Sequence, residues 1–380
     1  MKEIYLDNHS ATRPLPASIE AWLPFLQRYF GSTTSSHQKG AELFAPLHEH
    51  TELLLASLGA HPSDRFYFFA SHADAIEHLF FSYYLEQIRH SGKNHILTTN
   101  NEEAVILMSL KKLEELGCHG KTLPVNEEGK LTPALLKEAI KPRSSLLSLA
   151  WASGLTGVVQ PIEELAQICK EKQIALHVDA SYVIGKWPCF FHESGIDFLT
   201  FDGSFLHAPK GTAGLIIRDK TPLSAPLSAM TGISVGGIAS LAKSIEIVQQ
   251  KMDGMQLETA RLRDLLEKGI VKGFPQAQIL FKQQLRLPNC TAIAFPGVVS
   301  DALLFLLNRK KIYASLGGGH CQKLSHLLIA SHVDPCLAQC ALSFSLSFET
   351  TKEEIEQVIE AVVSSARHLS RLSSHLMEPT

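Results

Sequence analysis

The segment "VVQPIEELAQICKEKQIALHVDAS" (residues 158–181) joins a helix pattern to a buried-strand pattern, and this order decides the fold class. Pro161 is the residue type favoured at a helix start. Four apolar side chains then recur on one helical face: Ile162, Leu165, Ile168 and Cys169. The run "IALHVDAS" (174–181) has the continuous apolar character of a strand that is buried on both faces. Such a helix-to-strand unit is typical of an α/β protein with a parallel sheet.

Similar units extend on both sides of this segment. Five more apolar runs have the length of a buried strand: 65–71, 95–99, 145–152, 197–202 and 214–218. Helix signals lie between them, as in residues 100–117, which begin with Asn and Glu and end with Gly117. Strand–helix alternation over about 200 residues predicts a doubly wound, largely parallel sheet.

The pattern changes beyond about residue 265. Three β-like runs there precede a long helix: 290–297, 311–317 and 340–347. The helix is expected in residues 350–369, where Thr351 and Glu354 form a capping box. The apolar helical stretch 236–269 contains the boundary, and it either packs within the chain or faces a partner subunit. We predict three parts: an N-terminal segment that packs with the small domain (1–15), a large domain (16–255) and a small α+β domain (256–380).

The composition sets broad limits on function. The chain has 380 residues, is 45% hydrophobic and 19% charged, and carries a formal net charge of −3. It can bury sizeable cores, and its charge gives no electrostatic reason to expect nucleic acid or a membrane surface. We expect neither a signal peptide nor a membrane span. The seven cysteines are scattered and odd in number, which favours a reducing, cytoplasmic location.

Several segments, in order over nearly the whole chain, resemble the class V aminotransferases, specifically the NifS/IscS/SufS-type cysteine desulfurases. The matching segments are "IYLDNHSATRP" (4–14), "SSHQKGAE" (35–42), the stretch 154–188, "DFLTFDGSFLHAPKGTAGLIIR" (197–218) and "SFSLSFETTKEEIEQVIEAV" (343–362). The resemblance implies pyridoxal phosphate (PLP) as cofactor and the fold type I architecture. That fold has a large domain with a mainly parallel seven-stranded sheet and a smaller α+β C-terminal domain. It also implies a homodimer that mobilises sulfur from cysteine for a sulfur-transfer or iron–sulfur assembly partner.

Two positions decide how the resemblance bears on activity. Asp179 falls at the carboxylate that pairs with the pyridine nitrogen in the family. Phe205 falls at the lysine that forms the Schiff base, and phenylalanine can neither form an imine nor transfer a proton. Lys210 follows five residues later, but the family has a second lysine there as well. The sequence therefore predicts that internal aldimine formation is lost.

The phosphate site implied by the family is also altered. Asp74 falls at its hydroxyl residue and is expected to N-cap a helix, while His72 falls at a glycine. Asp202 takes a second hydroxyl position and Ser204 a histidine. Two carboxylates that face a phosphate repel it, by about 1 kcal/mol per pair at ~4 Å in water and ~4 kcal/mol at an effective dielectric constant of 20. PLP binding is therefore doubtful, unless these acids point elsewhere or one of them stays protonated.

Other family positions differ too. Glu102 replaces the histidine that stacks on the cofactor ring, Tyr182 a glutamine, Gly154 an asparagine and Ser343 the arginine that binds the substrate carboxylate; residues 231–237 lack the family's arginine. Cys321 falls at the persulfide cysteine, next to His320, and is otherwise an ordinary loop cysteine. Neither this pair nor Cys336 with Cys340 predicts a metal site.

Three interpretations follow from these residues. The chain is an active PLP enzyme, a non-catalytic relative that serves as scaffold or regulator, or a protein whose pocket is repurposed for a cationic or neutral ligand. The third rests on four acids: Asp74, Glu102, Asp179 and Asp202. The joint loss of lysine, phosphate ligands, stacking histidine and arginine in one pocket, with the core segments kept, favours the second.

Overall fold

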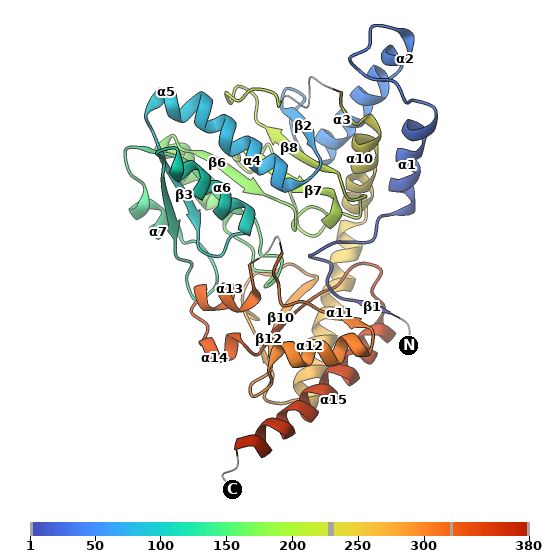
Figure 1. Cartoon of the computed structure of the whole chain (residues 1–380), viewed down its shortest axis with the longest axis vertical. Coiled ribbons are helices and arrows are strands. Elements are labelled where there is room, and N and C mark those ends of the chain that lie inside the picture. Colours follow the sequence, from blue (N-terminus) through green and yellow to red (C-terminus); the bar gives the residue numbers. More distant parts are fainter. Residues whose placement is uncertain (1–2, 227–231, 320–321, 378–380) are drawn as a thin grey trace.

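The computed structural model describes residues 3–226, 232–319 and 322–377. It has a larger part built on a seven-stranded sheet and a smaller part built on a three-stranded sheet, one above the other in Figure 1. Helices α10 (Val235–Gln250) and α11 (Met252–Gly273) run from one part to the other. Within the described residues, none of the helices is long and apolar enough to cross a membrane.

The large sheet has the strand order β2-β8-β7-β6-β5-β3-β4, and only β8 runs antiparallel to its neighbours. Its strands are β2 (Arg65–Phe69), β3 (His95–Thr99), β4 (His119–Leu123), β5 (Ser144–Ala150), β6 (Ala175–Asp179), β7 (Phe198–Asp202) and β8 (Ala213–Ile217). The predicted strands are all present, although several end earlier than expected. Strand β4 was not predicted, because it is an edge strand whose residues are mostly exposed.

Helices cover both faces of this sheet. Neighbouring strand residues such as Ile96 and Leu97 point into different hydrophobic cores, one beneath α4 and α6, the other beneath α3, α8 and α10. The large part contains α1 (Pro16–Gln27), α2 (Gln38–Ala41), α3 (Phe44–Ser57), α4 (His72–Tyr83), α5 (Arg89–Ser91), α6 (Ala104–Glu115), α7 (Pro133–Ala139) and α8 (Ile162–Lys172). The predicted doubly wound arrangement is therefore confirmed.

The smaller part packs α11, α12 and α15 around β10 and β12. Its elements are β9 (Gln278–Ile279), β10 (Cys290–Ala294), β11 (Ile312–Tyr313), β12 (Ala341–Ser345), α12 (Ser300–Arg309), α13 (Leu324–Ala330), α14 (Pro335–Ala338) and α15 (Lys352–Met377). The capping box is confirmed, because the Thr351 amide donates to Glu354 Oε2 (3.1 Å) and the Glu354 amide to Thr351 Oγ1 (3.2 Å).

Two features concern the predicted division of the chain. The stretch 236–269 was predicted as one helix, but it is interrupted at Lys251, where α10 ends and α11 begins. Because α11 crosses residues 255 and 256, the division into 16–255 and 256–380 stays a proposal. Strand β1 (Ile4–Tyr5) pairs in parallel with β11 and so attaches the N-terminal segment to the smaller part.

Candidate active site

Phe205 lies in a cluster of three rings at the carboxyl end of the parallel strands. It ends the short 3₁₀ helix η2 (Gly203–Phe205), which directly follows β7. Its ring centroid is 5.1 Å from that of Tyr182 and 5.7 Å from that of His72. Phe205 is only 3% exposed and Tyr182 only 2%. The residue at the expected lysine position therefore packs inside the protein as part of its core.

His72 connects two buried carboxylates. Its Nδ1 lies 3.0 Å from Asp202 Oδ2, and its Nε2 lies 3.1 Å from Glu103 Oε2. Burial by itself lowers the pKa of His72, but the hydrogen bonds to Asp202 and Glu103 outweigh burial and raise this pKa to about 11. His72 is thus an imidazolium that donates a proton to each carboxylate. The hydrogen bonds to His72 in turn outweigh burial at Asp202 and lower the pKa of that carboxyl group.

Asp202 also occupies the start of helix α4. Its Oδ2 accepts the backbone N–H of His72 (3.0 Å), and its Oδ1 accepts the N–H and hydroxyl of Ser204 (2.9 and 2.6 Å). Free N–H groups at a helix start form an anion site, and here a side chain of the same protein supplies the anion. The resemblance assigns Asp202 to a phosphate-ligand position, and in the structure its carboxylate binds the start of α4 and the His72 ring.

Asp74 does not have the predicted capping role. The N-cap of α4 is Ser71, whose hydroxyl oxygen accepts the Asp74 amide at 3.1 Å. Asp74 itself is exposed, and its carboxylate accepts a hydrogen bond from the Ser71 hydroxyl at 2.8 Å. The alternative that one of the acids points elsewhere therefore holds for Asp74. The expectation failed because Ser71 occupies the position before the first helical residue, three residues upstream.

Glu102 bonds to the backbone and to one neighbouring side chain, Thr99. Its Oε2 accepts the Ala150 amide at 2.7 Å, and its Oε1 lies 2.6 Å from Thr99 Oγ1. The Thr99 hydroxyl also lies 2.7 Å from Asn101 Oδ1, and with one hydrogen it can donate to only one of the two acceptors. Both contacts become hydrogen bonds when Glu102 is protonated and donates to Thr99. Burial raises the pKa of Glu102 to about 8, in agreement with this arrangement.

Asp179 is held at the end of β6. Its Oδ2 accepts the Thr200 hydroxyl at 2.6 Å and its Oδ1 the Ser181 amide at 3.0 Å. Thr200 in turn lies 3.0 Å from His177 Nε2, and burial lowers the pKa of His177 to about 3. Burial also raises the pKa of the Asp179 carboxyl group, with the nearby His72 acting in the opposite direction. Asp179 is thus buried and satisfied by its own protein.

Two replaced positions fit each other directly. A Cβ atom at Gly154 would lie 2.6 Å from ring atoms of Tyr182, closer than carbon atoms can approach. The ring of Tyr182 therefore fills the space that an asparagine side chain needs at 154. Ser343, at the arginine position, is fully buried on β12, and its hydroxyl donates to the Leu155 carbonyl at 2.7 Å. That spot has no room for a guanidinium group.

Some predicted site residues stand apart from this cluster. Cys321 and His320 lie outside the described residues, as does Thr231 at the start of the segment expected to lack arginine. Lys210 is exposed, in contrast to the buried Phe205. The sequence interpretation noted His72 only as a residue in place of a glycine, and it missed Glu103. The one available signal for this ion cluster was that the resemblance assigns His72 to the same site as several acids.

The whole chain is similar in sequence and structure to proteins of known family. A model described as aminotransferase class V matches residues 4–233 and 231–358. A cysteine desulfurase of Gluconacetobacter diazotrophicus is 32% identical over 357 residues, covering 90% of this chain and 88% of the relative. A cysteine desulfurase of Nostoc sp. is 33% identical over 325 residues, covering 83% of this chain and 80% of the relative. The solved structure of a NifS-like protein aligns with a TM-score of 0.89 at 26% identity, covering 97% of this chain and 100% of the other.

These similarities confirm the resemblance noted in the sequence and the expected architecture. The mostly parallel seven-stranded sheet of this chain belongs to a fold that aligns with the NifS-like structure, a PLP-dependent fold type I protein. PLP is the cofactor of this family, and the relatives are named for the release of sulfur from cysteine.

Proposed function

This chain belongs to the class V aminotransferase family, and from that premise we propose that it is a cysteine desulfurase homologue that does not form an imine with PLP. We infer that it keeps the family fold and serves as a non-catalytic scaffold or regulatory partner in the mobilisation of sulfur from cysteine. The proposal concerns the chemistry of the pocket, because the ancestry is shared with catalytic relatives.

The observation that carries the proposal is the filling of the cofactor place by the chain's own side chains. Phe205, Tyr182 and His72 are each at most 5% exposed and pack against one another. Asp202 accepts the His72 N–H at the start of α4, where a phosphate would bind. The residues present therefore do not fit PLP, which requires a lysine, an anion site and space for a ring.

The two other interpretations are less well supported. A repurposed acidic pocket needs carboxylates that await a ligand, whereas Asp202 already bonds to His72, Glu102 to Ala150, and Asp179 to Thr200. An active PLP enzyme needs a lysine at the Schiff-base position. Lys210, in the same loop as Phe205, is exposed, and the amino group of Lys186 donates to the Phe205 carbonyl at 3.0 Å. We therefore retain both as alternatives and favour the non-catalytic homologue.

Mixing the purified full-length chain with PLP tests the proposal. We expect no stoichiometric imine absorbance, no rise in thermal unfolding temperature with PLP, and no alanine or sulfide from added cysteine. Borohydride followed by peptide mass mapping identifies any lysine that reacts. The matched control is the variant Lys210→Met, which removes the one lysine of the loop.

A stoichiometric adduct on Lys210 that is absent from Lys210→Met would contradict the proposal, as would release of sulfur from cysteine that depends on PLP. Weak adducts spread over many exposed lysines support it, because free amines react with an aldehyde without any site.

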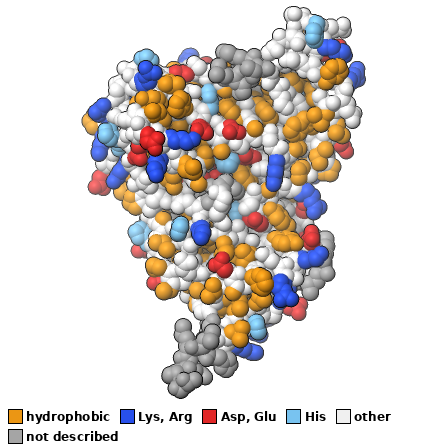
Figure 2. All heavy atoms as spheres, viewed as in Figure 1, with side chains coloured by type: hydrophobic (Ala, Val, Ile, Leu, Met, Phe, Trp, Pro, Cys, Tyr) orange, Lys and Arg blue, Asp and Glu red, His pale blue; other side chains and the backbone are white. Residues whose placement is uncertain are grey.

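We further propose that the chain forms a homodimer, as members of this family commonly do. Figure 2 shows hydrophobic side chains gathered at the upper right, over the region where Figure 1 places α1 and α10. Exposed large apolar side chains on and just after α1 support this: Ile19, Leu23, Leu26 and Phe30. Sedimentation equilibrium measures the mass, and a monomer at micromolar concentration contradicts the proposal.

A cytoplasmic location and a sulfur-transfer or iron–sulfur assembly partner remain proposals on the same family grounds. The six cysteines in the described part of the chain are all free thiols, which supports a reducing compartment. Co-purification of the intact chain with such proteins tests the partner.

A further inference from the structure

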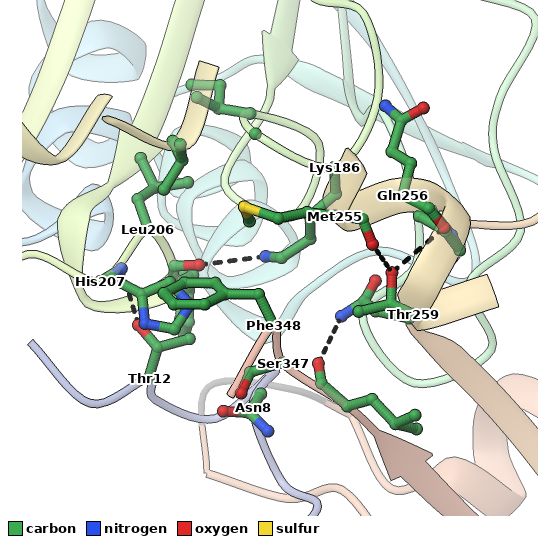
Figure 3. Close-up of a pocket in the computed structure, with 17 residues that line it drawn as sticks. Asn8, Thr12, Lys186, Leu206, His207, Met255, Gln256, Thr259, Ser347 and Phe348 are labelled. Atoms are coloured by element: carbon green, nitrogen blue, oxygen red, sulfur yellow. Dashed lines mark hydrogen bonds between the residues drawn. The ribbon is translucent and has the colours of Figure 1, made fainter. Parts of the chain in front are cut away.

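A small cavity adjoins the backbone of the loop that carries Phe205. It lies where the N-terminal segment, this loop, helix α11 and residues 346–348 meet, as Figure 3 shows. Its volume is ≈ 30 Å³, which suits one or two waters or a molecule of a few heavy atoms. A cofactor the size of PLP cannot enter it. The cavity therefore differs from the place of the ring cluster in its size and in the polar groups that line it.

Lys186 brings a charge into this cavity without a counter-charge. Its Nζ donates to the carbonyl oxygen of Phe205 at 3.0 Å, and in Figure 3 its amino group lies between Met255 and Phe348. Lys186 forms no ion pair with a carboxylate of the described residues, and no Asp or Glu lines the cavity. Burial lowers the pKa of Lys186 to about 8. One hydrogen bond leaves two of its three N–H donors for another partner.

His207 is the nearest titratable neighbour in the cavity wall, and it does not supply the missing charge. Its Nδ1 donates to the Arg13 carbonyl at 2.8 Å, so the ring is fixed against the N-terminal segment. Burial lowers the pKa of His207 to about 4, and the nearby Lys186 acts in the same direction. His207 is therefore neutral at physiological pH. The cavity holds one cation and no anion of its own.

Two amide side chains in the cavity wall have an unused polar atom. Asn289 is 5% exposed, and its Nδ2 donates to the Leu346 carbonyl at 3.1 Å, which fixes the orientation of the amide. Its Oδ1 is buried without a hydrogen-bond partner in the described chain, and so is Nε2 of Gln256. A buried polar atom without a partner costs about 1–3 kcal/mol. A cation and an unpaired acceptor, the Asn289 oxygen, thus line one small space, whereas the Gln256 amide points away from the Lys186 amino group in Figure 3.

We propose that this cavity is a binding site for a small oxyanion of the carboxylate or carbonate type, such as formate, acetate or bicarbonate. The anion accepts hydrogen bonds from Lys186, which has two N–H donors left. Bicarbonate also carries a hydroxyl that can donate to Asn289. Such an anion neutralises a charge that is costly to bury alone, and its few heavy atoms match the cavity. This site does not depend on whether the ring cluster admits PLP.

The experiment measures thermal unfolding of the intact chain in increasing formate, acetate or bicarbonate at constant ionic strength. We expect a saturable rise for the native chain, and apparent binding that is at least about tenfold weaker in Lys186→Met, since a charge-assisted bond is lost. Lys210→Met removes an exposed lysine of the loop that carries Phe205 and should leave the response unchanged.

A second readout uses the native chain alone and needs no variant. Isotope-labelled methylation of its lysines makes the pKa of Lys186 visible by NMR, and we expect saturating formate to raise it. An unchanged Lys186 signal, or equal stabilisation of the native chain and Lys186→Met, overturns the proposal. Equal stabilisation by chloride and formate overturns the choice of an oxyanion.

Discussion

The ring and the carbonyl of Phe205 face two environments that differ in how their charges are paired. On the ring side, His72 lies between Asp202 and Glu103, so that each buried charge has a partner. On the carbonyl side, Lys186 reaches Phe205 O and meets no carboxylate. A pocket whose charges are satisfied internally has no need of a ligand, whereas a cavity with a lone cation does. The ring side of Phe205 is thus paired internally, whereas its carbonyl side holds a single cation.

The ring side can be understood as a cofactor place occupied from within. Asp202 supplies the anion at the start of α4, and the rings of Phe205 and Tyr182 supply apolar volume. Because helix α4, the segment of Tyr182 and the segment of Asp202 and Phe205 are distant in sequence, the fold itself holds these groups in contact.

The largest expected effect comes from breaking the charge balance of the ring side. His72→Gln leaves Asp202 and Glu103 buried without a cation, and we expect a loss of about 3–5 kcal/mol in the free energy of unfolding. Urea denaturation at pH 7 measures this loss. His72→Gln combined with Glu103→Gln should recover part of it, because only one carboxylate then remains and it keeps the helix start.

The alkaline range gives an independent check on His72. Its folded pKa of about 11 lies above the ordinary 6.5, so its contribution is complete below pH 6.5 and is lost as the pH rises towards 11. The variant His72→Gln should lack this part of the loss of stability at alkaline pH. A native chain whose stability does not fall between pH 7 and 11 speaks against the imidazolium.

A graded effect, which is absent in acid and grows with pH, is expected at Glu102, at the edge of the ring side. This acid has a pKa raised from 4.5 to about 8, so its contribution is complete below pH 4.5 and is lost as the pH rises through 8. Glu102→Gln keeps an uncharged side chain of the same shape. We expect the free energy of unfolding of Glu102→Gln to match that of the native chain below pH 4.5. Between pH 4.5 and about 8 it should exceed that of the native chain by up to about 1.4 kcal/mol for each pH unit.

Denaturant unfolding from pH 4 to 9 measures this difference, with Glu128→Gln as the control at a half-exposed carboxylate. A parallel pH dependence in the native chain and Glu102→Gln would show that Glu102 is ionised throughout and that Thr99 donates to it.

The smallest expected effect concerns the fit of Gly154 to Tyr182. Gly154→Ala places a methyl group against the tyrosine ring, and overpacking of this kind costs about 1–3 kcal/mol. In the Tyr182→Gln background the same change should cost at least about 1 kcal/mol less, because the ring is gone. A double-mutant cycle of unfolding free energies measures the coupling, and additivity within about 0.5 kcal/mol refutes it.

Local patterns were sufficient for most of the fold. The helix that follows Pro161 and the capping box of Thr351 and Glu354 depend on residues a few positions apart, and both are present. The sequence also placed Phe205 correctly in the loop after a strand. Strand β4 escaped prediction because an edge strand with exposed side chains lacks the continuous apolar run of the inner strands.

The candidate site was harder to predict because its contacts join distant segments. His72 and Asp202 are 130 positions apart, and no local pattern connects them. The sequence indicated that acids replace phosphate ligands, but not that a histidine at a glycine position neutralises one of them. The cavity at Lys186 is defined by what its wall lacks, a carboxylate, which becomes visible only when the surrounding segments are in place.

The N-terminal segment has a consequence for how the protein is made. The Thr12 hydroxyl donates to Ser204 O, and Asn8 Nδ2 donates to Ser345 O, 337 positions further along the chain. Ribosomes add about 5–20 residues per second, so the first dozen residues wait on the order of 20–70 seconds for the partners they need. Until then this end stays exposed to chaperones and proteases. The final assembly of the protein is therefore expected only once Ser345 has left the ribosome.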